Sequence, residues 1–141
     1  MSYDNSWVLD TQQKIFSRLS AVCQARLGTK YADLRVTMDS HTPTTPKFPS
    51  IYVFFMAREV GQDLVGQDMN AVYLTAEIEI TVTEAQGVVV ANEVSQVVVD
   101  CMKEMRFPTD QIPEFRDTDT EYRTVSRFAR YIGNADVLYD A

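Results

Sequence analysis

The chain has little of the residue types on which most enzyme sites depend. Its 141 residues include one histidine, His41, and two cysteines, Cys23 and Cys101, which lie far apart in the sequence. A metal site built on His41 and the neighbouring Asp39 would lack a second histidine or a cysteine cluster. Both cysteines fall within helix-like patterns, so they are interpreted as buried thiols rather than as a disulfide or a metal-binding pair.

The motifs of phosphate binding and of carboxylate catalysis are also missing. The sequence contains no GxxxxGK[ST] and no GxGxxG, which excludes a glycine loop of the familiar kinds. Glu77 and Glu79 lie two residues apart and are interpreted as the solvated face of a strand. The stretch "DTDTE" at 117–121 lacks the glycine and the closing glutamate of an EF-hand, so it indicates at most weak surface cation binding. We therefore expect a protein that is not an enzyme and needs no cofactor or metal.

No apolar run approaches the roughly 18 residues that a membrane-spanning helix needs. The opening "MSYDNSWVLD" also lacks the basic and then apolar layout of a signal peptide. We expect a soluble protein, without membrane contact, that stays in a cytoplasm. With 45% hydrophobic residues the chain has enough apolar side chains for one core, and we expect a single domain over 1–132 followed by a short polar tail, 133–141.

Basic residues are scarce in the second part of the chain. The formal net charge is −7, but residues 1–58 hold 7 basic and 4 acidic groups, whereas residues 59–141 hold 6 basic and 16 acidic groups. Because affinity for DNA comes mainly from basic groups that displace counterions, this balance disfavours a protein that grips DNA. Acidity also serves solubility alone, so the charge by itself does not identify a function.

Two segments have the periodicity of amphipathic helices. In the first, residues 10–28, Ile15, Leu19 and Val22 share one face, Asp10 or Ser6 is a candidate cap, and the glycine at 28 is a natural end. The second, residues 86–105, is rich in valine, as strands are. Its apolar residues nevertheless keep helical spacing over about twenty residues, which outweighs the small helix penalty of valine.

Four segments are predicted to be strands. They are the short 34–38, the β-branched and aromatic 50–60, the strictly alternating 71–84, and 121–133. The proline-containing 39–49 and the glycine-containing 61–70 are predicted to be a loop and a hairpin tip, and 106–121 a loop. The near-consecutive strands suggest an antiparallel meander. We expect a two-layer α+β fold, with a mostly antiparallel sheet of about four strands and two amphipathic helices on one face.

The segment "EYRTVSRFARYIG" at 121–133 concentrates Arg123, Arg127 and Arg130 in an otherwise acidic region. As a helix it would place all three arginines on one side, opposite Val125 and Phe128. As a strand it would place Arg123, Val125 and Arg127 on one face and Phe128 with Arg130 on the other. Its tyrosine, threonine, valine and phenylalanine content favours the strand. Three arginines are few for nucleic acid, and pairing with carboxylates of the same chain is the simplest role.

The chain begins with an N-terminal helix, has "FPSIYVFF" after a proline-containing loop, and has an asparagine before "AVYLTAEIEITVT". A helix that ends in "VVVDCMKEMRF", a proline-broken loop and the closing "YRTVSRFARYIG" follow. In this order of motifs, over about residues 6–132, the chain resembles the tail terminator, or tail completion, proteins of long-tailed bacteriophages. The resemblance supports a strand for this closing segment, because family members end their fold in one.

The resemblance implies a structural virion protein that forms a ring, typically a hexamer, on the head-proximal end of the tail tube. Such a protein is made in the host cytoplasm. Its partners would be copies of itself, the tail tube protein and a head-completion or neck protein, and DNA would pass through the ring without specific binding. A neck, head-completion or tail-tube protein, and a small non-viral ligand-binding domain, are the alternatives.

A ring also needs different surface patches that meet between neighbouring copies, and complementary acidic and basic side chains suit such contacts. The candidate subunit or partner interface consists of Arg123, Arg127, Arg130, Asp63, Asp68, Arg116, Asp117 and Asp119.

Overall fold

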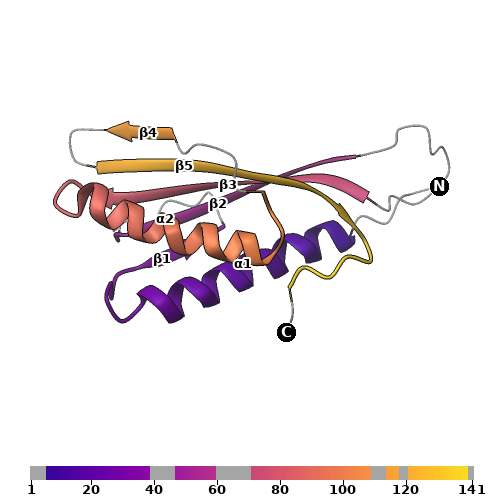
Figure 1. Ribbon diagram of the computed structural model, residues 1–141, viewed down its shortest axis with the longest axis horizontal. Coiled ribbons are helices and arrows are strands. Elements are labelled where there is room, and N and C mark those ends of the chain that lie inside the picture. The colour runs from indigo at the N-terminus through magenta and orange to yellow at the C-terminus, as the bar shows by residue number, and fades with distance from the viewer. Residues whose placement is uncertain (1–5, 39–46, 60–70, 109–113, 118–120, 140–141) are drawn as a thin grey trace.

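The computed structural model has two layers, a sheet and a pair of helices that cover one of its faces (Figure 1). The structure describes residues 6–38, 47–59, 71–108, 114–117 and 121–139. The elements follow one another in the order α1, β1, β2, β3, α2, β4 and β5. The expected two-layer α+β fold, with a mostly antiparallel sheet and both helices on one face, is confirmed.

Both predicted helices are present. Helix α1 spans Ser6–Leu27 and α2 spans Gly87–Glu104. The valine-rich segment is a helix because its spacing gives it one buried stripe, which includes Ala91, Val94 and Val98. Helix α2 ends with Arg106 at a φ of 66°, while the N–H of Phe107 donates to the carbonyl of Met102 and that of Arg106 to the carbonyl of Lys103. These two bonds form a Schellman motif, in which glycine commonly occupies the position of Arg106.

The three longest strands form the centre of the sheet. β2 spans Ser50–Glu59, β3 spans Ala71–Thr83 and β5 spans Glu121–Gly133. The strand order is β1-β2-β3-β5-β4, so β3 lies in the middle and pairs in antiparallel fashion with β2 on one side and β5 on the other. The strict alternation predicted for β3 is present, because Val72, Leu74, Ala76, Ile78, Ile80 and Val82 are all buried against the helices.

Two predictions about the edges of the sheet were wrong. β1, Arg35–Thr37, pairs with β2 in parallel, so the first three strands do not form an antiparallel meander. The connection at 38–49 is long enough to return the chain to the same end of the sheet, as a parallel pair requires. The segment 106–121 is not all loop, because Glu114–Asp117 form β4, which pairs with β5 and gives the sheet a fifth strand.

The core lies between the sheet and the helices. Ile15, Leu19 and Cys23 of α1 are fully buried there, and Phe128 of β5 is 3% exposed. The segment after Gly133, which the sequence suggested was a polar tail, includes Leu138, which is 7% exposed and belongs to the same core cluster. Among the described residues, no helix has the length and apolar content to cross a membrane.

Candidate subunit interface

The face of the sheet that carries no helices holds two of the four predicted interface arginines, Arg123 and Arg127. Cross-strand pairing aligns Tyr52 with Glu79 and Val125, and Phe54 with Glu77 and Arg127. Residues directly opposite each other on antiparallel strands point to the same face, so these rows place charged side chains beside apolar and aromatic ones on the open face. Segment 121–133 is a strand, as its composition predicted, and the helical alternative is excluded.

Arg127 and Arg123 pair with carboxylates of their own chain. The Nε of Arg127 donates to Oε2 of Glu77, its register partner on β3, at 3.1 Å. Arg123 donates from Nη2 to Oε2 of Glu121 at 3.0 Å, and its Nη1 lies 3.7 Å from Oε1 of Glu79. Arg127 and Arg123 keep 43% and 41% of their side chains exposed, so solvent weakens each pair to at most about 1 kcal/mol.

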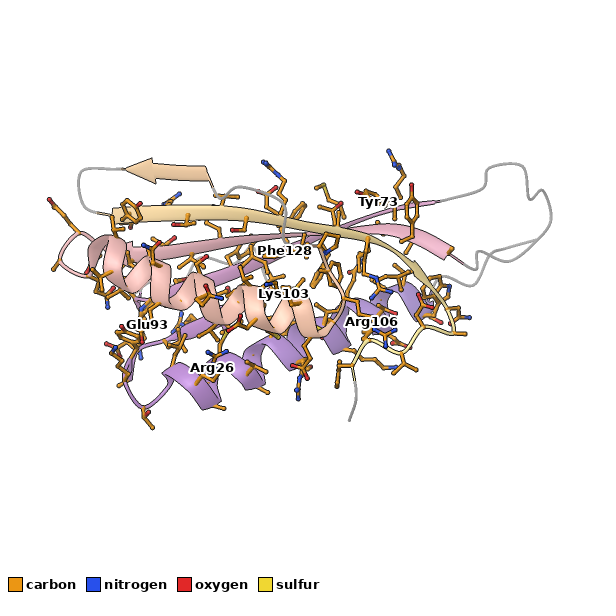
Figure 2. All side chains as sticks on the ribbon, in the orientation of Figure 1. Arg26, Tyr73, Glu93, Lys103, Arg106 and Phe128 are labelled. Atoms are coloured by element: carbon orange, nitrogen blue, oxygen red, sulfur yellow. The ribbon has the colours of Figure 1, made fainter. Side chains whose placement is uncertain are left out.

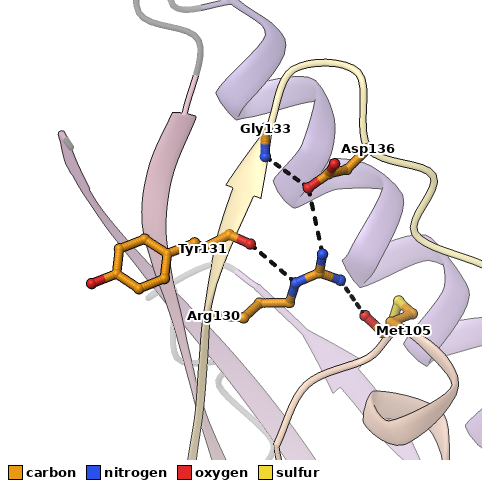
Figure 3. A network of polar contacts seen from close by, with 5 residues as sticks. All are labelled: Met105, Arg130, Tyr131, Gly133 and Asp136. Carbon is orange, nitrogen blue, oxygen red and sulfur yellow. Dashed lines mark hydrogen bonds and ion pairs between the residues drawn. The ribbon is translucent and has the colours of Figure 1, made fainter. Parts of the chain in front are cut away.

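Arg130 lies on the other face, beside the end of α2 (Figure 3). Its Nη1 donates to the carbonyl of Met105 at 2.7 Å, its Nε to the carbonyl of Tyr131 at 3.3 Å, and its Nη2 to Oδ2 of Asp136 at 3.5 Å. The guanidinium also lies over the ring of Phe107, 5.7 Å from its centroid. Only 16% of the side chain is exposed. These contacts hold β5, the end of α2 and the C-terminal segment together.

The remaining predicted interface residues are acidic, apart from one arginine. Asp63, Asp68 and Asp119 lie outside the described residues. Arg116 and Asp117 belong to β4, where their backbones lie opposite Arg123 and Tyr122 of β5. The side chains of β4 are outside the described part of the chain. The structure therefore brings the backbone of Arg116 close to Arg123 on one sheet edge.

Sequence reasoning missed an apolar group on the open face. Phe54 and Met56 are each 46% exposed, and Tyr131 is 62% exposed. Tyr73 packs its ring against that of Tyr131, with the centroids 4.8 Å apart, and Arg58 lies over the Tyr73 ring at 5.3 Å. Figure 2 shows Tyr73 on the side of the sheet away from the helices. We call Phe54, Met56, Arg58, Tyr73 and Tyr131 the sheet patch.

The outer surface of the helix pair is held by ion pairs that run along its length. Arg18 contacts Glu104 at 2.6 Å, Arg26 contacts Asp100 at 3.1 Å, and Lys30 contacts Glu93 at 2.9 Å. Hydrogen bonds from Lys30 and from the Tyr31 hydroxyl lower the pKa of Glu93. Hydrogen bonds from Gln96 and from Arg26 lower the pKa of Asp100. Three ion pairs thus link α1 and the segment after it to α2.

The surroundings of the two cysteines do not favour the reactive thiolate form. Cys23 and Cys101 are free and buried. Burial raises the pKa of the Cys23 thiol to about 12 and that of Cys101 to about 11. Thiolates are the reactive form, so both side chains are inert near neutral pH, as structural cysteines are. Their interpretation as buried thiols is confirmed.

The acidic excess of the chain lies mainly outside the part with described side chains. That part holds 12 basic and 10 acidic residues, close to neutral. The rest holds Arg116 as its only basic residue, against ten acidic residues: Asp4, Asp39, Glu59, Asp63, Asp68, Asp110, Glu114, Asp117, Asp119 and Asp140. The net negative charge therefore belongs to residues 1–5, 39–46, 59–70, 109–120 and 140–141 rather than to the residues whose side chains are described.

Two minor candidates from the sequence also fall outside the described part. His41 with Asp39 lies in 39–46, and the central Asp119 of "DTDTE" lies in 118–120. Among the residues that the structure does describe, no three histidine, cysteine, aspartate or glutamate side chains gather as a metal site would require.

Comparisons with known proteins add support for the fold. No protein-family model and no curated protein matches the chain. A solved structure known only by a sequence identifier superposes with a TM-score of 0.60, over 92% of this chain and 95% of its own, at 11% sequence identity. The match covers nearly the whole of both chains, so the two-layer arrangement occurs as a complete unit in another protein. An identity this low carries information about fold alone.

Proposed function

We propose that this chain is the subunit of a ring that caps the head-proximal end of a bacteriophage tail tube and provides the docking surface for the head. The observation that carries the proposal is the open sheet face. It leaves Phe54, Met56 and Tyr131 exposed on a protein whose other sheet face packs against the two helices. Contiguous exposed apolar side chains on a small domain are typical of a surface that contacts another protein.

The order of elements supports the same proposal. The helix, the strand "IYVFF", the alternating strand β3, helix α2 and the closing strand β5 are the motifs on which the resemblance to tail terminators rests. The proposed ring is a homo-oligomer, and six copies is the subunit number to test first. Its further partners are the tube protein and a head-completion protein. Its role is structural and involves no catalysis.

The charge distribution supports passage of DNA rather than adhesion to it. Basic groups bind DNA by displacing counterions, and most basic residues of the body are already paired with carboxylates or aromatic rings. The segments at 59–70 and 109–120 add seven acidic residues and one basic residue. A ring built from such subunits would let DNA slide through its opening.

The test is electron microscopy of the protein mixed with tail tubes, assembled from a tube protein encoded beside it, together with light scattering of the protein alone. We expect a discrete oligomer, or a monomer that becomes one on the tubes, and extra density at one tube end. Density along the whole tube would indicate a tube subunit instead. A stable monomer that ignores tubes would contradict the proposal and favour a small binding domain.

A further inference from the structure

A second exposed apolar group lies where α2 begins. Val88 and Val89 are 48% and 77% exposed in the first turn of the helix, and Glu84 is exposed in the turn before it. We call Glu84, Val88 and Val89 the helix-start patch. No described side chain covers these valines, although valine is among the residues most often buried.

The two patches lie toward opposite ends of the molecule. The sheet patch includes Tyr73, near the beginning of β3, whereas the helix-start patch follows Thr83, the last residue of that strand. Ten residue steps of about 3.3 Å separate these positions by roughly 33 Å. Figure 1 shows α2 beginning at one end of the sheet, while β3 begins near the other. One copy cannot bring its own two patches together.

The patches are also complementary in charge. Arg58 of the sheet patch stacks on Tyr73 and forms no ion pair with another described residue. Glu84 of the helix-start patch likewise has no ion pair within the described part of the chain. Each patch thus combines exposed apolar side chains with one charge, and the two charges are opposite. An apolar centre with charges at its rim is the usual composition of a protein–protein contact.

We propose that the sheet patch of one copy of this chain binds the helix-start patch of the next copy, with Arg58 opposite Glu84. The inference rests on the proposed function in that it requires ring formation, and it adds the two surfaces that meet. Contact between two different patches is heterologous, and such contacts close into a ring when the rotation between neighbours permits. Phe54 and Met56 would then be covered by Val88 and Val89.

Charge reversal tests the pairing of the two patches. Arg58→Glu places two carboxylates at every contact, and Glu84→Arg places two guanidinium groups there. We expect each variant to weaken self-association, measured by sedimentation, at least roughly tenfold. The double variant should recover the wild-type association. An equal mixture of the two single variants should also recover it, because alternating copies then meet only opposite charges.

Two matched controls carry the same changes in charge outside the patches. They are Lys14→Glu on α1 and Asp33→Arg before β1, which alter exposed residues without ion pairs in the described part of the chain. Both should associate as the wild type does, and thermal unfolding should be similar for all variants. If the controls weaken association as much as the patch variants do, or if the double variant fails to recover it, the proposed contact is wrong.

Cross-linking identifies the geometry. Met56→Cys and Val89→Cys are mixed under a mild oxidant, with the buried Cys23 and Cys101 left in place. A heterologous contact predicts disulfide-linked dimers in the mixture and none from either variant alone. Dimers from Met56→Cys alone would show two sheet patches in contact, and their appearance would overturn the proposal.

The outcomes separate this inference from the function on which it rests. Rings that still cap tail tubes when Arg58 and Glu84 are reversed would contradict the contact but leave the function standing. Rings that depend on both residues but never bind tubes would support the contact and contradict the function. A wild-type protein that never associates at the highest attainable concentration, alone or with tubes, would contradict both.

Discussion

The two faces of the sheet are built from the same strands but carry different kinds of side chain. On the covered face, Leu74, Ala76 and Ile78 of β3 are completely buried beneath the helices. On the open face, the alternate residues of the same strand form ion pairs, and the neighbouring strands expose Phe54 and Tyr131. The apolar side chains of β3 on the covered face are therefore buried in the core of the folded chain, whereas the open face keeps apolar side chains that remain exposed after folding.

The largest difference between the two faces should appear when one side chain on each is shortened. Ile78→Ala removes a fully buried side chain and should lower the free energy of unfolding by about 2–5 kcal/mol. Thr75→Ala changes a partly exposed residue on the open face of the same strand and should cost less than about 1 kcal/mol. Urea unfolding monitored by circular dichroism measures both. Equal losses would contradict the division of the faces.

The second prediction concerns an arginine that belongs to the covered side. Arg130→Met keeps an unbranched apolar stem but removes the donors to Met105 and Asp136, and should lower the free energy of unfolding by about 1.5–3 kcal/mol. Arg123→Met makes the same change on the open face, where the ion pairs are exposed, and should cost less than about 1 kcal/mol. A smaller loss for Arg130→Met than for Arg123→Met would contradict this assignment of roles.

The sequence predicted the covered face better than the open one. The alternation of β3 and the helical spacing of α2 arise from burial, and burial leaves a periodic pattern in the residues. The sheet patch left no such pattern, because Phe54, Phe55 and Met56 are consecutive apolar residues and only cross-strand register separates those that face the helices from those that do not. β4 was missed because its four residues, which follow a proline and include acidic side chains, are too few to show an alternating pattern.

The arginines show a similar limit. Their strand was predictable from composition, but the partner of each depends on register, which places Glu77 directly opposite Arg127. The contacts of Arg130 with the carbonyl of Met105 and with Asp136 depend on how α2 and the C-terminal segment end. A single sequence shows neither the strand register that pairs Arg127 with Glu77 nor the packing that brings Met105 and Asp136 to Arg130.

The third prediction concerns a position on the covered side where the local conformation is unfavourable. Arg106 has a positive φ, which costs an ordinary side chain more than it costs glycine. Arg106→Gly should therefore raise the free energy of unfolding by about 0.5–1 kcal/mol, after the greater freedom of glycine in the unfolded chain is counted. Lys103→Gly, in the last turn of the same helix, should lower it by a similar amount. Thermal unfolding distinguishes them, and destabilisation by both would show that the side chain of Arg106 is needed there.

The smallest effect on folding, but a larger one on assembly, is expected on the open face. Arg127→Glu places a carboxylate directly opposite Glu77 on the neighbouring strand, and this repulsion should lower the free energy of unfolding by about 0.2–1 kcal/mol. Ring formation should fall further, because the cross-strand row that holds this pair also holds Phe54, at the border of the sheet patch.

The double exchange Glu77→Arg with Arg127→Glu restores an opposite pair and should recover both stability and assembly. If Arg127→Glu instead unfolds the protein while its remaining folded fraction assembles normally, the role of Arg127 is internal, and the open face near it takes no part in the contact between copies.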